Sequence, residues 1–243
     1  MTERMGVGQF RELGNELRQF REGLGIPGYV LAERLGWSAT KVSRIENGLT
    51  SASEIDVLRY AAHCGVGAES IDGLLEMCRE PGTAGYWMSN RLSTLILHET
   101  TAASSASYDP LVIPGLLQTH EYATELITAT GLEDGLVEYF VDTRMERQCG
   151  LHGRPFEFYI HEQVLRLPVG GNTLMNEQLL KLVLLAEQSH LTIRVVPMAM
   201  GARSMFEGEF VVFSYVDRRP LVYLPSVGLY LDEPGQVSNY QEN

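Results

Sequence analysis

The first 80 residues carry apolar positions at three- and four-residue steps, separated by glycines and short polar turns. This spacing places apolar side chains on one face of a helix, and it predicts five short helices that pack as one all-α domain. The first stripe runs over Gln9–Glu22, where the apolar residues are Phe10, Leu13, Leu17 and Phe20. The alternating charges on the other face of this helix predict exposure to solvent.

Residues 26–48 hold two of these predicted helices, joined by a tight turn. Gly36 ends the first helix, because glycine adopts the left-handed backbone at low cost. Ser38 is the N-cap candidate of the second helix. Val42 and Ile45 point inward at i and i+3, so small polar and basic side chains lie on the other faces. This layout is typical of a helix–turn–helix that enters the major groove of DNA.

A cluster of turn residues at Pro81–Gly85 predicts the end of the first domain. Helical spacing resumes over Tyr86–Ala103, and Ser104–Ser107 is expected to end that helix. The sequence therefore predicts three parts: a DNA-binding domain at 1–80, a helical connector at 81–107 and a second domain at 108–243.

The second domain mixes helical and strand patterns. Helices are expected over Thr119–Thr130, Leu136–Gln148 and Asn172–Ser189. Five segments rich in β-branched and aromatic residues predict strands, at 156–160, 191–196, 209–215, 221–224 and 228–231. The predicted fold class is thus multidomain, an all-α domain followed by an α+β domain with about five strands. The aromatic residues of the strands either line a pocket or form an ordinary core.

Composition is that of a globular protein, with 44% hydrophobic and 21% charged residues. We see no basic, apolar leader, and no apolar run reaches the roughly 18 residues of a membrane helix. We therefore expect a cytoplasmic protein without a membrane partner, associated with the nucleoid when it binds DNA. The cysteines are odd in number and lack metal-ligand spacing, which predicts buried thiols rather than disulfides: Cys64, Cys78 and Cys149.

The formal net charge of −12 argues against a generic nucleic-acid binder. Residues 1–48 hold seven basic and six acidic side chains, a net charge of +1, so the acidity lies in the remaining 195 residues. A nearly neutral helix–turn–helix in an otherwise acidic protein predicts modest DNA binding, with an affinity that depends strongly on salt concentration.

No catalytic, cofactor or metal site is expected. The pair His161–Glu162 and His190 lack a third ligand and the helical spacing of a zinc site. The serines of Ser104–Ser107 lie in no Gly-x-Ser-x-Gly nucleophile turn. These patterns do not favour an enzyme.

Two stretches, Leu31–Gly36 and Lys41–Gly48, resemble the XRE-type (lambda-repressor-like) helix–turn–helix family. The run P-x-x-I-P-G-L-L-Q-T at Pro110–Thr119 resembles the WhiJ-like regulators of actinobacteria, as do three shorter segments, Leu167–Gly171, Val195–Pro197 and Leu229–Pro234. The resemblance implies a transcription regulator of development or secondary metabolism. It also implies a C-terminal domain of unassigned biochemistry and, often, a small acidic partner protein.

Within that family, Gln is common at the positions matching Gly28 and Ala39, and neither residue can hydrogen-bond through its side chain here. The predicted DNA-binding set is Thr40, Lys41, Ser43 and Arg44 for the bases, Asn47 for the phosphate backbone and Ser38 at the helix start. The plain alternative for Lys41 and Arg44 is solvated helix charge, with Glu46 as an ion-pair partner of Arg44.

These observations lead to the hypothesis of a sequence-specific, repressor-like regulator of double-stranded DNA, whose C-terminal domain senses a ligand or docks a partner. A homodimer is expected, because the short helix–turn–helix of one chain buries little DNA surface. The alternative is a protein-interaction module with weakened DNA binding, which Gly28 and Ala39 favour. A small-molecule sensor or enzyme is a third class, but the sequence shows no set of polar residues that would form its binding or catalytic site.

Overall fold

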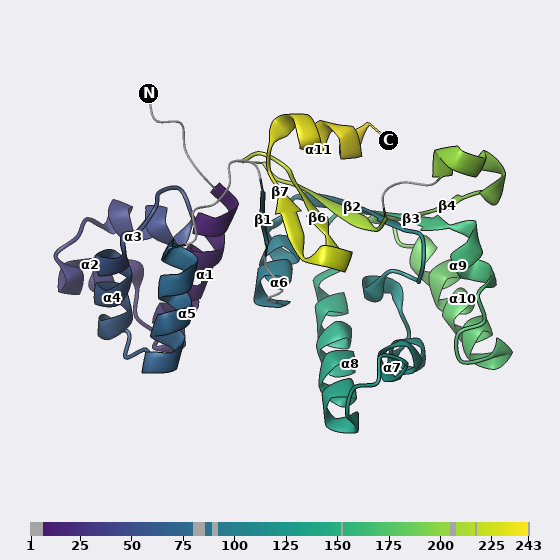
Figure 1. Cartoon of the computed structure of the whole chain (residues 1–243), viewed down its shortest axis with the longest axis horizontal. Helices are drawn as coiled ribbons and strands as arrows, with labels where there is room; N and C mark the ends of the chain where they lie inside the picture. The colour runs from purple at the N-terminus through teal and green to yellow at the C-terminus, as the bar shows by residue number, and fades with distance from the viewer. Residues whose placement is uncertain are drawn as a thin grey trace. The chain divides into compact units, whose positions relative to one another are not determined.

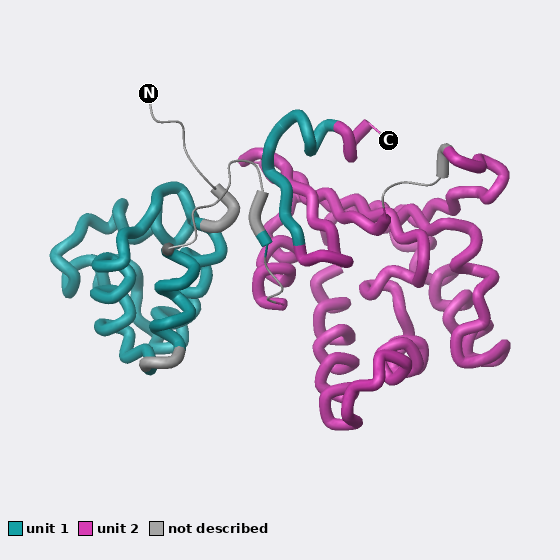
Figure 2. The backbone as a smooth tube through the Cα atoms, in the orientation of Figure 1, with its two compact units in different colours: residues 1–90, 229–238 teal, residues 91–228, 239–243 magenta. Residues whose placement is uncertain are grey.

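The computed structural model describes residues 7–79, 86–88, 92–151, 153–204, 208–216 and 218–242. The chain forms two compact units, residues 1–90 with 229–238 and residues 91–228 with 239–243 (Figure 2). The turn cluster Pro81–Gly85, predicted as a boundary, lies outside the described residues. No helix in the described ranges has the length and apolar character needed to cross a membrane.

The first unit contains five helices, labelled in Figure 1: α1 (Val7–Gly23), α2 (Gly28–Leu35), α3 (Ala39–Glu46), α4 (Glu54–His63) and α5 (Ala68–Arg79). The predicted five-helix domain is therefore confirmed. Apolar residues from all five helices form one core, which includes Leu13, Leu17, Leu31, Leu35, Val42, Ile45, Val57, Tyr60 and Leu74.

The charged face of α1 is only partly solvated, because three of its charged residues are buried. Arg11, Glu12 and Arg21 are only 6%, 7% and 8% exposed. Helix α1 packs against α3, α4 and α5, so neighbouring helices cover its charged side as well as its apolar stripe. Periodicity alone cannot detect such burial, because buried ion pairs and solvated charges look the same along one helix.

Two glycines let α1 lie against the end of α3. A Cβ added at Gly14 would lie 2.2 Å from the carbonyl oxygen of Ile45. Gly48 has a φ of +63°, and a Cβ there would lie 2.5 Å from the Cα of Arg11. A side chain at either position would therefore push the two helices apart.

The first unit also contains a strand pair. β1 (Tyr86–Met88) runs antiparallel to β7 (Leu229–Leu231), with Trp87 opposite Tyr230. The helix predicted over Tyr86–Ala103 is thus correct only for α6 (Leu92–Thr101), because its first residues form a strand.

Five strands of the second unit lie in the order β6-β5-β2-β3-β4. They are β2 (Ser104–Asp109), β3 (Phe156–His161), β4 (Leu191–Val196), β5 (Phe210–Ser214) and β6 (Leu221–Leu224). β2, β3 and β4 are parallel, whereas β5 is antiparallel to both β2 and β6. The α+β prediction is confirmed. The helix before Ser104–Ser107 ends as predicted, but the sequence analysis did not predict that these residues begin the central strand β2.

The helices of the second unit are α6, α7 (His120–Thr128), α8 (Asp134–Gln148), α9 (Glu162–Arg166) and α10 (Asn172–Ala186), and α11 (Pro234–Gln241) follows β7. Short 3-10 turns are η1 (Gly115–Leu117), η2 (Cys149–Leu151), η3 (Met198–Ser204) and η4 (Pro225–Val227). Figure 1 shows α7, α8, α9 and α10 on one side of the sheet. Their core includes Ile113, Leu117, Tyr122, Phe158, Ile160, Met175 and Leu182.

The signature segment Pro110–Thr119 is held by buried amide side chains. Gln118 is 1% exposed; its Nε2 donates to the Ile113 carbonyl at 2.7 Å, and its Oε1 accepts from Arg144 Nη1 at 2.6 Å. Gln178 of α10 donates to the Leu117 carbonyl at 2.9 Å. These bonds satisfy a buried backbone that belongs to no long helix or strand, which gives the segment a structural role.

The cysteines differ in burial. Cys64 is buried, and Cys78 is half-buried with its Sγ 3.1 Å from the Ala52 carbonyl oxygen, as expected for thiols without a disulfide. Cys149 is exposed at the start of η2, so the prediction of a buried thiol is wrong there.

Candidate nucleic-acid interface

The turn between α2 and α3 has the local chemistry that the sequence predicts. Gly36 adopts the left-handed conformation, with φ 69° and ψ 31°, and the Trp37 amide donates to the Ala32 carbonyl at 2.8 Å. Ser38 caps α3, since its Oγ accepts from the Lys41 amide at 3.1 Å. These caps fix where α2 ends and α3 begins.

Helix α3 presents one open face. Val42 and Ile45 are buried, whereas Thr40 and Arg44 are exposed one helical turn apart. Neither the Thr40 nor the Arg44 side chain has a hydrogen bond or ion pair with another described residue, so the ion pair considered for Arg44 with Glu46 does not form. Both side chains are free to contact a ligand.

Lys41 is tied to the next helix. Its Nζ donates to Asp56 Oδ1 at 2.8 Å and lies 4.0 Å from the centre of the Trp37 ring. Asp56 also completes a capping box with Ser53 at the start of α4, as the sequence suggests. Burial alone would raise the pKa of Asp56, but hydrogen bonds from Lys41 and Ser53 lower it overall. The ammonium predicted to read bases therefore contacts a carboxylate within the domain.

Asn47 and Ser43 form a second local network. Asn47 is the C-cap of α3, and its Nδ2 donates to the Ser43 carbonyl at 2.7 Å and to Ser43 Oγ at 3.3 Å. Asn47 Oδ1 accepts from Arg18 Nη2 of α1 at 2.7 Å. Arg18, which the sequence placed on a solvated face, thus adds a partly exposed cation beside the predicted phosphate contact.

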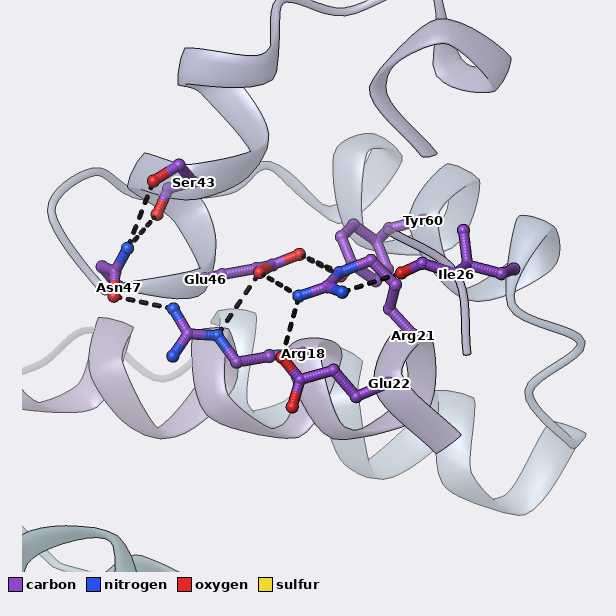
Figure 3. A network of polar contacts seen from close by, with 8 residues as sticks. All are labelled: Arg18, Arg21, Glu22, Ile26, Ser43, Glu46, Asn47 and Tyr60. Carbon is purple, nitrogen blue, oxygen red and sulfur yellow. Dashed lines mark hydrogen bonds and ion pairs between the residues drawn. The ribbon is translucent and has the colours of Figure 1, made fainter. Parts of the chain in front are cut away.

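The end of α3 is fixed by the buried carboxylate of Glu46 (Figure 3). Arg21 donates to both oxygens of Glu46, Nε to Oε1 at 2.7 Å and Nη2 to Oε2 at 2.8 Å, and the Tyr60 hydroxyl donates to Oε1 at 2.6 Å. Arg18 Nε adds a contact of 3.3 Å with Oε2. Burial would raise the pKa of Glu46, but the bonds from Arg21 and Tyr60 lower it overall.

A carboxylate in the last turn of a helix is normally unfavourable, because the C-terminus of a helix is the negative end of its dipole. Here the Arg21 guanidinium offsets that charge and joins α3 to α1, while Tyr60 adds α4. The four contacts with Glu46 fix the C-terminal end of α3. Sequence analysis missed this network because its members lie up to 28 residues apart.

Among the described residues, no group of three or more His, Cys, Asp or Glu side chains is arranged to hold a metal ion. The candidate site of this unit is the exposed face of α3, formed by Thr40 and Arg44 and flanked by Arg18 and Asn47.

Residues 12–74 match a family model described as a helix–turn–helix domain. This match and the geometry of α2 and α3 define the class of the protein, a DNA-binding transcription regulator. Residues 92–243 match the model of a domain of unknown function, DUF5753, and the chain belongs to that family. No curated protein sequence matches the chain.

Two solved structures are similar to the helical part. The clp gene regulator ClgR from C. glutamicum is 24% identical, with a TM-score of 0.26, and the match covers 29% of this chain and 87% of that one. The restriction-modification controller protein C.AhdI from Aeromonas hydrophila is 22% identical, with a TM-score of 0.26 and coverage of 27% and 94%.

Proposed function

We propose that the protein is a sequence-specific, repressor-like regulator of the XRE type and the WhiJ-like group, and that α3 reads its operator. The observation that carries this proposal is the contrast between the two sides of α3. Its inner end is fixed by the contacts of Glu46, while Thr40 and Arg44 point outward without partners in the described structure. Recognition in the major groove requires a helix that is held in a fixed position and exposes polar side chains that can contact the bases.

We also propose that the protein acts as a homodimer. Helix α3 has eight residues, which at 1.5 Å per residue makes a reading element only about 12 Å long. Two copies placed about 34 Å apart would contact successive major grooves on one side of the duplex. Genomic footprinting of the tagged protein tests this, because a dimer predicts paired half-sites with a fixed spacing.

The C-terminal domain would regulate the reader by sensing a ligand or by docking a small partner protein. Charge favours a small-molecule ligand over an acidic partner, because residues 81–243 hold 19 acidic and ten basic side chains, a net charge of −9. A small acidic partner would meet like charge on most of that surface, which costs affinity. Docking therefore requires a local basic patch, whereas ligand sensing does not.

The test of DNA reading is an anisotropy titration of labelled promoter fragments, at low and at moderate salt, with the Arg44→Ala variant. A lost base contact should weaken specific binding by about 1–3 kcal/mol and relax sequence preference. Arg34→Ala is the matched control, since it removes the same charge from an exposed position on α2. It should weaken all sequences slightly and equally. Equal effects of both variants, or no sequence preference at either salt, would contradict the proposal.

A second candidate function is an interaction module in which DNA binding has weakened. This function is supported by side chains that cannot contact DNA or are already paired. Gly28 and Ala39 have no polar side chain, and Lys41 is paired with Asp56. Such a module predicts that Arg44→Ala leaves every functional readout unchanged, so the same variant separates the two functions.

A further inference from the structure

The second unit contains a cavity of about 450 Å³ against one face of its sheet. Strands β2, β3 and β5, helices α6 and α8 and the segment before η1 contribute its lining. This volume lies within the roughly 300–1,000 Å³ of small-molecule sites in proteins. The cavity is large enough for a compact ligand with one ring.

A polar stripe on β2 lies along the cavity. Ser105, Ser107 and Asp109 alternate along the strand, so their side chains share one face. Their register partners on β3 are Phe156, Phe158 and Ile160, which are apolar. On β5, Phe213 lies opposite Ser105 and Val211 opposite Ser107. The stripe of hydroxyl and carboxyl groups is thus flanked by apolar residues on both sides.

The polar side chains of this stripe make few hydrogen bonds within the described structure. Ser105 is 6% exposed, and its Oγ has no hydrogen-bond partner among the described residues. Asp109 accepts one hydrogen bond, from Ser107 Oγ at 2.7 Å. A buried hydroxyl without a partner is unfavourable, and a bound ligand is one way to satisfy it.

A second carboxyl group lies beside Asp109. Tyr108 pairs with Phe210, so Glu209 follows directly in register with Asp109. Burial, with an added effect of the nearby Glu209 carboxylate, raises the pKa of Asp109 to about 7, against the lowering effect of the Ser107 hydrogen bond. Burial also raises the pKa of Glu209. Neither carboxyl group forms an ion pair with another described residue.

The arginines of the cavity are directed to other partners. Arg147 donates to Glu99 through Nε at 2.9 Å and Nη2 at 2.6 Å. Arg144 Nη1 donates to Gln118 at 2.6 Å, in the signature segment. The two carboxyl groups therefore lack a counter-charge, and a cation from outside the chain would supply it.

We propose that this cavity binds a small molecule with a protonated amine and an apolar body, with the amine between Asp109 and Glu209 and the body against Phe156 and Phe158. The inference rests on the proposed sensing role of the C-terminal domain and names the chemistry of its ligand.

The test uses the full chain and three probes of similar size, 2-phenylethylamine, 2-phenylethanol and 3-phenylpropionate, in calorimetric titrations and thermal-shift assays. The amine should bind saturably and raise the melting temperature, the alcohol should bind at least about tenfold more weakly, and the acid should not bind. Equal binding of the three probes, or no binding of the amine at up to about 5 mM, would overturn the proposal.

Variants locate the site. Asp109→Asn combined with Glu209→Gln should weaken amine binding about tenfold or more. Glu138→Gln is the matched control, because it removes an exposed carboxylate of α8 that does not line this cavity. Unchanged affinity in the double variant would overturn the proposal.

If the double variant does not fold, Glu209→Gln alone replaces it, since Glu209 lines the cavity and forms no ion pair with another described residue. Its amine affinity should fall a few-fold, and an unchanged affinity would overturn the amine placement. DNA titrations without amine separate the two proposals. Sequence-preferring DNA binding together with absent amine binding would contradict only the ligand assignment, whereas amine binding without DNA preference would contradict only the DNA-reading function.

Discussion

Replacing Glu46 by Gln tests whether the buried carboxylate holds the reading helix. Glu46 is 6% exposed and accepts two bonds from Arg21, one from Tyr60 and one from Arg18. Glutamine has nearly the same shape, but it is neutral and one of its oxygens becomes an NH₂ donor. That donor would face the donors of Arg21 or Tyr60, so at least one strong bond is lost.

The cost follows from what remains around Arg21. Its guanidinium is 8% exposed, and after the substitution it retains the Ile26 carbonyl at 2.8 Å and Glu22 at 3.1 Å. Removing one partner of a buried ion pair typically costs about 3–5 kcal/mol. Domains of this size have a free energy of unfolding of roughly 5–15 kcal/mol, so the substitution removes a large share of the stability.

The assay is urea unfolding of the full chain, followed by circular dichroism and tryptophan fluorescence. Glu22→Gln is the matched control, because its carboxylate contacts the same guanidinium but is 59% exposed. It should cost less than about 1 kcal/mol. Equal losses for the two variants would refute the reasoning that burial makes the Glu46 contacts strong.

The same pair has a pH signature. The folded-state pKa of Glu46 is lowered below its ordinary value of 4.5, so its stabilising contribution is fully present above that value and is lost as the pH falls through the folded pKa. The stability difference between the wild type and Glu46→Gln should therefore be largest near neutral pH and shrink in acid. A difference that grows in acid would contradict the lowered pKa.

Three further substitutions have defined outcomes. Gly14→Ala places a methyl group 2.2 Å from a carbonyl oxygen of α3, so urea unfolding should show a loss of about 1–3 kcal/mol or more. Asp109→Asn removes a carboxyl group whose folded pKa is about 7 instead of 3.8. Ionisation of this buried group destabilises the wild-type fold as the pH rises between these two values. The melting temperature of the variant, relative to the wild type, should therefore increase from about pH 4 to about pH 8. Asp56→Asn frees Lys41 for phosphate contact, so the salt dependence of DNA binding should steepen by up to about one counterion, unlike in the exposed control Asp72→Asn.

The elements that sequence predicted correctly are those fixed by local chemistry. Gly36 ends α2, Ser38 caps α3, and Ser53 with Asp56 forms the capping box of α4, each within a few residues of its partner. Turn and cap rules act over one helical turn, so they can be applied to one sequence without knowledge of the packing.

The contacts that sequence missed are long-range. Arg21 and Glu46 are 25 residues apart, and Lys41 and Asp56 are 15 apart, so no window of one helix contains both partners. The charges of α1 alternate as they would on a solvated face. Only the packing of α1 against three other helices makes them buried.

Strand β2 was missed for a related reason. Its inward residues include Ser105 and Ser107, which line a cavity instead of a hydrophobic core, so the strand lacks the apolar alternation that marks other strands. Phe156 and Phe158 carry that alternation on β3, which the sequence found. Polar residues that line a cavity in a central strand thus remove the apolar alternation by which the strand is recognised.

The structure of α3 limits what one copy of the protein can read. The contacts of Glu46 fix its end and the Lys41–Asp56 pair fixes its middle, which leaves Thr40 and Arg44 as its open, unpaired polar side chains in the described structure. A good bidentate base contact contributes about 1–3 kcal/mol of discrimination, whereas specific binding exceeds non-specific binding by about 4–10 kcal/mol. Under the proposed function, one copy of the helix–turn–helix supplies too few base contacts for that difference, so we expect two copies, or one copy aided by a partner, to bind the operator. A signal that changed the fraction of paired readers would then control occupancy of the operator without altering α3 itself.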